Sequence, residues 1–325
     1  MAMSFPQSDH CDGTRFFNPE PPLQSQKRRS HSMLRLLWAN LSRDPAGWAR
    51  WPKHVDNAVY PPPDGDRPSL TWIGHSSFLL CLGGMNILTD PIFSQRCSPV
   101  GFVGPKRVRA PGLKVENLPR IDLILLSHNH YDHMDMPSLH QICRRFPEAD
   151  IVTSLGNGGF LARKKLYRTT ELDWWQSVTI RDTTITATPA RHFAARTLWD
   201  RNKTLWAGFM LTHAGRTIYF AGDSGYSRGF SQIYERLGAP DLAMLPIGAY
   251  QPREVMATVH MDPLEAVQAF RDLHAKRAVG MHFGTFQLTG EPMDEPPLRL
   301  HNALASAGLT AEQFFVLDVG QSLGL

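Results

Sequence analysis

The chain has few cysteines, no long hydrophobic run and little excess of charge of either sign. Four cysteines in 325 residues, with no Cys-x-x-Cys pair, exclude a disulfide framework and favour a reducing, cytoplasmic location. No stretch approaches the ~18–20 consecutive apolar residues of a membrane-spanning helix, and the polar start of the chain does not resemble a signal peptide. A formal net charge of +4 gives no reason to expect nucleic acid as a partner.

Hydrophobic residues make up 42% of the chain, enough for a buried core. We divide it into an N-terminal arm with an amphipathic helix, residues 1–62, and a body, residues 63–325. The helix is expected at 31–42, where Leu34, Leu37 and Trp38 recur at helical spacing near several arginines. Such a helix can lie at a bilayer surface. Packing on the body, or on a second subunit of a homodimer, is equally open.

The body alternates short apolar runs with amphipathic segments. Apolar runs of this length, separated by glycines, are typical of strands. Two sets of strands, each followed by helices, predict an α/β fold in which two sheets pack face to face with helices outside. We expect strands at 70–73, 78–82, 86–88, 121–126, 150–153, 178–180, 185–188, 208–211, 217–220, 242–246 and 278–281, and helices at 137–146, 263–273 and 297–307.

A cluster of metal-ligand side chains directly follows the apolar run 121–126. His128 and His130 are two residues apart and can point the same way, whereas Asp132 and His133 can face a second point nearby. Imidazoles with a carboxylate suit zinc and related metals. Four such residues within six positions after a strand are a strong indication of a metal site.

Three further candidates occupy the same position relative to a strand. His192, Asp223 and His282 each follow an apolar run closely. A single histidine in that position is weak evidence, because it is more often a core or surface residue. Together with the cluster, these three residues predict a complete site at one edge of the two sheets.

The order of these ligand types resembles the metallo-β-lactamase superfamily, and more narrowly the family of N-acylphosphatidylethanolamine-hydrolysing phospholipases D. The resemblance covers about residues 70–320. The segments that carry it are Trp72-Ile-Gly-His75, Leu88-Thr-Asp-Pro-Ile-Phe93, Gly104-Pro-Lys-Arg107, 127–135, Phe220-Ala-Gly-Asp-Ser-Gly-Tyr226, Pro246-Ile-Gly-Ala-Tyr250, His260-Met-Asp-Pro263, His282-Phe-Gly-Thr-Phe286 and Phe314-Phe-Val-Leu317, with Arg15-Phe-Phe-Asn-Pro19 in the arm.

The resemblance implies a four-layer αββα sandwich and two Zn²⁺ ions as cofactors. One ion would be bound by His128, His130 and His192, the other by Asp132, His133 and His282, and Asp223 would bridge them. Two such ions supply an activated water as the nucleophile, so no serine or cysteine is required. Asp132 and Asp223 would then take part in catalysis as ligands.

Several other residues are candidates for lesser roles. His75 is predicted to line the site and contact the substrate, as is Tyr250, and His260 is predicted to act in catalysis by contacting the substrate or leaving group. The alternatives for the two histidines are a core histidine at His75 and a helix entry at Asp262-Pro263. Gly222-Asp-Ser-Gly225 echoes a serine-protease segment, but the rest of that arrangement is missing. The glycines at 156–159 lack the spacing of a phosphate loop and are interpreted as a turn.

The implied activity is a phospholipase D-type phosphodiesterase that cleaves N-acylphosphatidylethanolamine to phosphatidic acid and N-acylethanolamine. The alternative is hydrolysis of a small soluble lactone, ester or phosphodiester. Six basic residues between 96 and 120, and four more at 163–168, form either a solvated face or a surface that attracts anionic phosphate groups, so peripheral contact with a membrane is also open.

Overall fold

The computed structural model describes residues 4–20, 48–61 and 67–325. The helix predicted at 31–42 lies outside these ranges, as does the proposed boundary at residue 62, so the division into arm and body remains a prediction. Within the described ranges, no helix has both the length and the apolar character needed to cross a bilayer.

The first sheet combines an antiparallel half with a parallel half. Its strand order is β14-β1-β2-β3-β4-β5-β6. Pairing is antiparallel from β14 to β3 and parallel from β3 to β6. Its strands are β1 (Ser69–Gly74), β2 (Ser77–Leu82), β3 (Met85–Thr89), β4 (Leu123–Leu126), β5 (Asp150–Ser154), β6 (Thr169–Leu172) and β14 (Ser322–Gly324).

The second sheet also combines a parallel half with an antiparallel half. Its order is β13-β12-β11-β10-β9-β8-β7, parallel from β13 to β10 and antiparallel from β10 to β7. Its strands are β7 (Ser177–Ile180), β8 (Thr183–Thr188), β9 (Gly208–His213), β10 (Arg216–Phe220), β11 (Leu242–Pro246), β12 (Arg277–Met281) and β13 (Phe314–Phe315).

Two of the described helices, α2 (Met136–Arg145) and α6 (Pro263–Asp272), begin at a side-chain cap. At α6, Asp262 and Glu265 form a reciprocal capping box with Pro263 in the first turn, so the helix-entry signal is confirmed. Asp135 likewise accepts a hydrogen bond from the Ser138 backbone at the start of α2. The helical segments are η2 (Val115–Asn117), α2 (Met136–Arg145), α3 (Gly158–Arg163), α4 (Gly229–Leu237), α5 (Arg253–Met256), α6 (Pro263–Asp272) and α7 (Glu295–Ser306).

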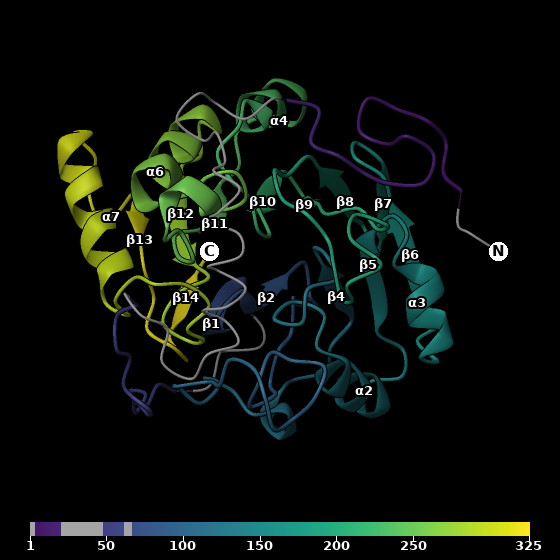
Figure 1. The fold of residues 1–325 in the computed structure, drawn as a ribbon, viewed down its shortest axis with the longest axis horizontal. Helices are drawn as coiled ribbons and strands as arrows, with labels where there is room; N and C mark the ends of the chain where they lie inside the picture. The colour runs from purple at the N-terminus through teal and green to yellow at the C-terminus, as the bar shows by residue number, and fades with distance from the viewer. Residues whose placement is uncertain (1–3, 21–47, 62–66) are drawn as a thin grey trace.

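The side chains of β4 show how the layers are built. Successive side chains of a strand point to opposite faces of its sheet. Leu123 and Leu125 belong to the hydrophobic cluster shared with the second sheet, whereas Ile124 and Leu126 pack with residues of α2 and α3. Figure 1 shows α2 and α3 beside the first sheet, and α4, α6 and α7 beside the second. The predicted α/β sandwich of four layers, αββα, is confirmed.

Each predicted strand and helix of the body has a counterpart in the structure, with ends shifted by a few residues. The turn interpreted at 156–159 is present at Gly156, but it is short, because α3 begins at Gly158. The sequence analysis also missed η2, β6, α3, α4, α5, β13 and β14. β14 pairs with β1, so the last strand of the chain completes the sheet built from the first half.

The described parts of the N-terminal region pack on the body without forming a helix. The side chain of Phe16 is buried in the core shared by the two sheets. The indole of Trp51 donates a hydrogen bond to the Glu291 carbonyl at 2.8 Å. Residues 4–20 and 48–61 are therefore part of the same packed unit as the body.

Candidate metal centre

The predicted ligands come together because several strands end at one edge of the sandwich. His128 follows β4, Asp223 follows β10 and His282 follows β12 within one to three residues. His192 follows β8, which runs in the same direction as β10 because both are antiparallel to β9. The carboxyl ends of these strands, contributed by both sheets, thus deliver side chains to a common point.

His128, His130 and His192 form the first group. His128 Nε2 lies 2.8 Å and His192 Nε2 lies 3.2 Å from His130 Nδ1. A donor atom from each of the three can be chosen so that all lie within 4.8 Å of one another. These are the three residues expected to share one metal ion.

Asp132, His133 and His282 form the second group, joined by His75. Asp132 Oδ2 lies 3.3 Å from His133 Nε2 and 3.4 Å from His282 Nε2. His75 Nε2 is closer, at 2.9 Å, and makes a hydrogen bond to the same oxygen. The second predicted set is therefore assembled, and His75 is a neighbour of its carboxylate.

Asp223 lies between the two groups. Its Oδ2 is 3.0 Å from His133 Nε2 and 3.2 Å from His282 Nε2 in the second group. The same oxygen is 3.7 Å from His192 Nε2 and 3.9 Å from His128 Nε2 in the first. This position is the one required of a carboxylate that touches two ions.

The buried polar atoms between the two groups are better placed to bind metal than to hydrogen-bond with one another. Three of these atoms are buried and lack a hydrogen-bond partner among the described residues: His133 Nε2, His282 Nε2 and Asp223 Oδ1. Other nitrogen and oxygen atoms that could bind metal lie close to them. Leaving a buried polar group unpaired costs about 1–3 kcal/mol. Ions bound among these atoms would satisfy them, so the residues fit the expected cofactor.

Three of the histidines predicted as ligands are held in place through the other nitrogen of the ring. His133 Nδ1 is 2.7 Å from Asp90 Oδ2, and His192 Nδ1 is 2.8 Å from the Val259 carbonyl. His128 Nδ1 is 2.9 Å from the Ser127 hydroxyl. Partners of this kind fix the tautomer and the orientation of a ligating ring, so that Nε2 faces the site.

Asp90 is the residue that the sequence analysis missed. Its carboxylate also accepts hydrogen bonds from the Ser127 backbone at 2.8 Å and the Ser127 hydroxyl at 2.5 Å. The available signal was its position directly after β3, which is parallel to β4 and ends beside it. Burial, which penalises the charged form, raises the pKa of Asp90 despite its histidine and serine partners.

Burial also determines the charge of the first group. It disfavours imidazolium, lowering the pKa of His128 well below its ordinary range, of His130 to about 3 and of His192 to about 4. In the second group burial also lowers the pKa of His282, but the charge of Asp223 and the hydrogen bonds to Asp132 and Asp223 together outweigh it and raise that pKa to about 9. The first group is therefore a set of neutral imidazoles, the form that binds metal.

The remaining candidates divide between the site and its surroundings. His260 lies beside the cluster, with its ring centroid 5.0 Å from that of His192 and 5.1 Å from that of His282. Tyr250 is buried, but its hydroxyl donates to Glu295 Oε1 at 2.8 Å. A substrate contact by Tyr250 remains a prediction that would require this bond to break.

The motifs set aside as rivals have structural roles. The Ser224 hydroxyl accepts from the Arg191 backbone and donates to the Gly225 carbonyl, so among the described residues it bonds to backbone groups. The basic run 96–120 was interpreted as either a solvated face or a surface that attracts anions. Both interpretations are wrong for Arg107, because its side chain is buried. Its guanidinium donates to the Ile92 carbonyl at 2.6 Å and lies over the Phe286 ring.

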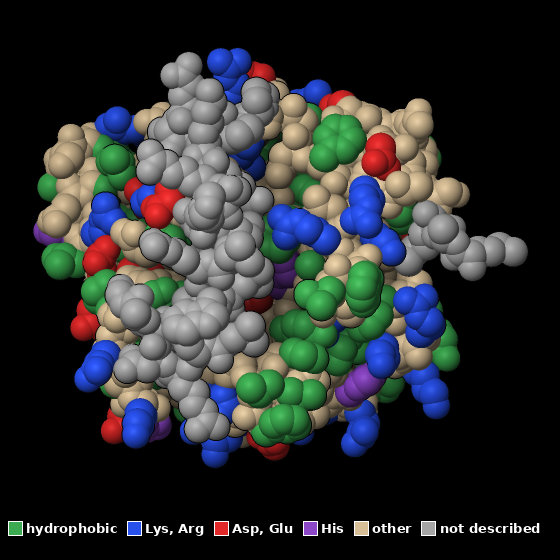
Figure 2. Space-filling model, viewed as in Figure 1, with side chains coloured by type: hydrophobic (Ala, Val, Ile, Leu, Met, Phe, Trp, Pro, Cys, Tyr) green, Lys and Arg blue, Asp and Glu red, His purple; other side chains and the backbone are tan. Residues whose placement is uncertain are grey.

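A cavity of about 710 Å³ adjoins the loop that carries the ligands. Asn129 and Tyr131 of that loop line it, together with residues of the segments 94–101 and 196–204. Arg196 ties the segment 196–204 to the loop of the predicted ligands, because its Nη1 donates to the Asn129 and Met134 carbonyls at 2.8 Å each. Figure 2 shows hydrophobic side chains gathered on the face in view, with Lys and Arg side chains beside them.

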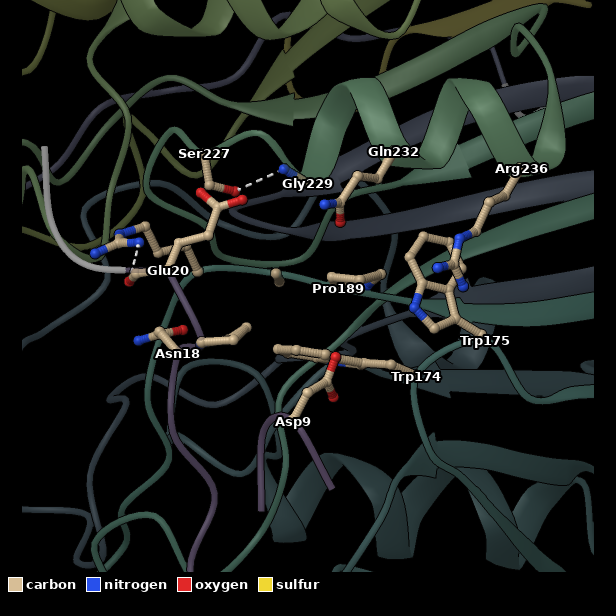
Figure 3. Close-up of a pocket in the computed structure, with 13 residues that line it drawn as sticks. Asp9, Asn18, Glu20, Trp174, Trp175, Pro189, Ser227, Gly229, Gln232 and Arg236 are labelled. Atoms are coloured by element: carbon tan, nitrogen blue, oxygen red, sulfur yellow. Dashed lines mark hydrogen bonds between the residues drawn. The ribbon is translucent and has the colours of Figure 1, made fainter. Parts of the chain in front are cut away.

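A smaller cavity, of about 120 Å³, lies between the N-terminal residues, the loops at 174–175 and 189–191, and α4. Figure 3 shows Asn18 and Glu20 on one side of it and Trp174 on the other. The Asn18 amide donates to the His192 carbonyl at 2.9 Å. The N-terminal segment therefore contacts the backbone of a predicted ligand and supports its position.

Comparison with known proteins agrees with this geometry. A family model described as the beta-lactamase superfamily domain matches residues 85–283. The chain belongs to this superfamily. A metallo hydrolase from the archaeon Ignicoccus hospitalis has the same fold, with a TM-score of 0.60 at 24% identity over 79% of this chain and 98% of that structure.

Within the superfamily, the chain is similar to N-acyl-phosphatidylethanolamine-hydrolyzing phospholipases D. It is 36% identical to phospholipase D 1 of Caenorhabditis elegans, over 77% of this chain and 74% of that protein. It is also 36% identical to the mitochondrial enzyme of Saccharomyces cerevisiae, over 78% of this chain and 55% of that protein. The family resemblance seen in the sequence is confirmed.

Proposed function

We propose that this metal-dependent hydrolase is a dinuclear zinc phosphodiesterase of phospholipase D type. Its substrate would be N-acylphosphatidylethanolamine, and its products phosphatidic acid and N-acylethanolamine. The observation that carries the proposal is the position of Asp223, whose carboxylate lies within 3.9 Å of histidines from both groups. The two relatives named for this activity support the choice of substrate.

The proposed ligand sets are those predicted from the sequence. His128, His130 and His192 would hold one ion, Asp132, His133 and His282 the other, and Asp223 both. When bound, two zinc ions supply an activated water and neutralise charge that develops on a phosphoryl group. Zinc is favoured because the donors are mainly imidazoles, with two carboxylates and no thiolate.

Residues around the ligands would do the positioning. His75 holds the Asp132 carboxylate through the 2.9 Å hydrogen bond, so its role is to orient that group and not to touch the substrate. His260 lies beside the cluster, and its buried Nδ1 has no hydrogen-bond partner within residues 4–20, 48–61 and 67–325. Its imidazole is thus available to contact the phosphoryl oxygens or to assist the departing alcohol.

A substrate panel tests the proposal directly. The purified protein would be assayed on detergent-dispersed N-acylphosphatidylethanolamine, on a lactone and on bis-p-nitrophenyl phosphate. We expect release of N-acylethanolamine from the lipid. Good turnover of the lactone with none of the lipid would overturn the proposal and select the alternative, a hydrolase of small soluble substrates.

The bond that breaks provides a second test. Attack at phosphorus by a water-derived nucleophile leaves the original oxygen in the N-acylethanolamine. Hydrolysis in ¹⁸O-labelled water should therefore place the label in phosphatidic acid only, and added short alcohols should not receive the phosphatidyl group. Label in the N-acylethanolamine would mean carbon–oxygen cleavage, and transfer to alcohols would mean a covalent intermediate on the protein.

A further inference from the structure

We propose that Glu291 is a positioning residue for the predicted metal centre and acts through the segment 247–260. Glu291 lies in the loop between β12 and α7, whereas the segment 247–260 begins directly after β11. The segment contacts one predicted ligand from each histidine group, so its shape affects both. The proposal rests on the proposed function only in that the positioned site would bind zinc, and its test measures metal binding without turnover.

Hydrogen bonds fill the acceptor capacity of the Glu291 carboxylate, which is buried. Its Oε1 accepts from the backbone N–H of Ala249 at 2.6 Å and of Tyr250 at 3.3 Å. Its Oε2 accepts from the backbone N–H of Gln251 at 3.1 Å and from the Thr289 hydroxyl at 2.8 Å. An ionised carboxylate offers about four acceptor positions, so these donors occupy all of them. Three consecutive N–H groups directed at one anion define the shape of the turn at 248–251.

This turn contains a residue in an unfavourable backbone conformation. Ala249 has a φ of 60°, in the left-handed region where a Cβ crowds the backbone. Such a conformation persists only where the surrounding structure holds it. The 2.6 Å hydrogen bond to Glu291 is made by the N–H of this same residue, so the carboxylate stabilises the turn at its strained position.

The first part of the segment packs against the backbone of His282. The Ile247 N–H donates to the Met281 carbonyl at 3.0 Å. At Gly248 the approach is so close that an added Cβ would lie 2.2 Å from the His282 carbonyl oxygen. His282 has a φ of 64°, so its backbone also depends on the packing around it. A shift of the turn would therefore move the imidazole whose Nε2 lies 3.2 Å from Asp223.

The last part of the segment orients His192. α5 follows the turn directly, and the Met256 carbonyl at its end accepts from the Val259 N–H at 2.9 Å. The Val259 carbonyl in turn lies 2.8 Å from His192 Nδ1. The segment thus reaches the first histidine group as well as the second, and Glu291 holds it near its start.

The described N-terminal region fixes Glu291 from the other side. The Trp51 indole donates to the Glu291 carbonyl at 2.8 Å, and the Ala49 N–H donates to the Gly290 carbonyl at 3.0 Å. The Gln287 amide donates back to the Ala49 carbonyl at 2.7 Å. A group that positions others must itself be held by its neighbours, and these bonds supply that support.

The substitution Glu291→Gln tests the proposal. The amide oxygen can still accept, but the NH₂ group would face two hydrogen-bond donors whichever way the amide is turned. We expect the turn to shift and the zinc affinity, measured by competition with a chelator, to fall by about tenfold, the lower end of the ~10–100-fold typical of outer partners. The absorption spectrum of the cobalt(II)-loaded protein should change too, because it reports ligand geometry.

Two further variants disturb the same contacts and leave the carboxylate in place. Thr289→Val removes one of its hydrogen bonds and should give a smaller loss of affinity. Gly248→Ala places a methyl group against the His282 carbonyl and should also weaken zinc binding. The control is Glu171→Gln, because Glu171 likewise accepts a 2.6 Å hydrogen bond from a backbone N–H, that of Gly158 at the start of α3. It should leave zinc affinity and the cobalt spectrum unchanged.

Three outcomes would overturn the proposal. One is an unchanged zinc affinity and cobalt spectrum in Glu291→Gln, whatever its melting temperature. Another is an equal loss of affinity in Glu291→Gln and Glu171→Gln, which would assign Glu291 to general stability. If Glu291→Gln does not fold, unchanged affinity in both Thr289→Val and Gly248→Ala is the third. Failure of the wild type to hydrolyse N-acylphosphatidylethanolamine, with zinc affinity still reduced in Glu291→Gln, would overturn the proposed function instead and leave the role of Glu291 standing.

Discussion

The Nδ1 atom of His133 lies 2.7 Å from Oδ2 of Asp90, a carboxylate that is itself fully buried. Asp90 directly follows β3, and His133 lies in the loop that follows β4, the neighbouring parallel strand. The contact turns Nε2 of His133 toward Asp132 and Asp223. Asp90 is thus a positioning residue for a predicted ligand that it precedes by 43 residues in the chain.

Replacing this carboxylate should weaken metal binding without unfolding the protein. In Asp90→Asn the amide oxygen can still accept from His133, but the charge that supports the ring is lost. Outer partners of ligating histidines typically contribute 10- to 100-fold in metal affinity or activity, and we expect a loss in that range of about 10–100-fold. Competition with a chromophoric chelator would measure the affinity.

Asp122→Asn is the matched control for Asp90. Asp122 is also buried, but it binds Arg120 and Arg181 at the opposite ends of the strands. Its replacement should lower the melting temperature and leave metal affinity unchanged. Equal metal loss in both variants would show that Asp90 acts through general stability.

Asp223→Asn should reduce activity far more than stability. The carboxylate lies between the two histidine groups, whereas the sheets that carry it are held by their own core. We expect a larger loss than the ~10–100-fold of an orienting partner. Activity assays and thermal melts of the same variant would distinguish the two effects. A variant whose activity loss is explained by unfolding at the assay temperature would contradict the assignment.

Removal of metal should abolish activity and destabilise the fold. Seven predicted ligands in two groups give an expected content of two transition-metal ions per chain, which elemental analysis of the active protein would measure. Because ions bind the native site and not the unfolded chain, treatment with a chelator should lower the melting temperature, and zinc should restore it. Full activity with one ion or fewer per chain would refute the dinuclear site.

His10 should make stability depend on pH. Its ring is buried and lies 2.7 Å from Asp173 and 2.6 Å from Asp9. Burial favours the neutral ring, but hydrogen bonds to Asp173 and Asp9 outweigh it and raise the pKa of His10 above 6.5. The ion pairs therefore stabilise the fold fully below about pH 6.5, and the contribution is lost as pH rises through the higher pKa of the folded state.

The measurement is the free energy of unfolding as a function of pH. The wild type should lose stability from slightly acidic to alkaline pH more steeply than His10→Gln, in which the titrating group is gone. His54→Gln is the control, because His54 and its partner Asp56 are exposed and should contribute little. Identical slopes for the wild type and His10→Gln would refute the prediction.

The sequence analysis succeeded where local pattern and local chemistry coincide. The apolar run before Ser127 predicted β4, and the residues after it predicted the first ligands, because a buried strand and its adjoining loop are both readable within a few positions. The Asp262-Pro263 entry to α6 was equally local. β14, by contrast, has three residues and is held by pairing with β1 across most of the chain.

The sequence by itself determined the class of fold, the identity of the predicted ligands and their positions after the ends of strands. These depend on hydrophobic periodicity and on ligand chemistry, which belong to single segments. Only the tertiary structure decided that Asp223 lies between the two histidine groups, that Asp90 supports His133, and that Glu291 holds the turn beside His282. Those relations join residues that are distant in the chain, and sheet pairing and packing alone set the distances between them.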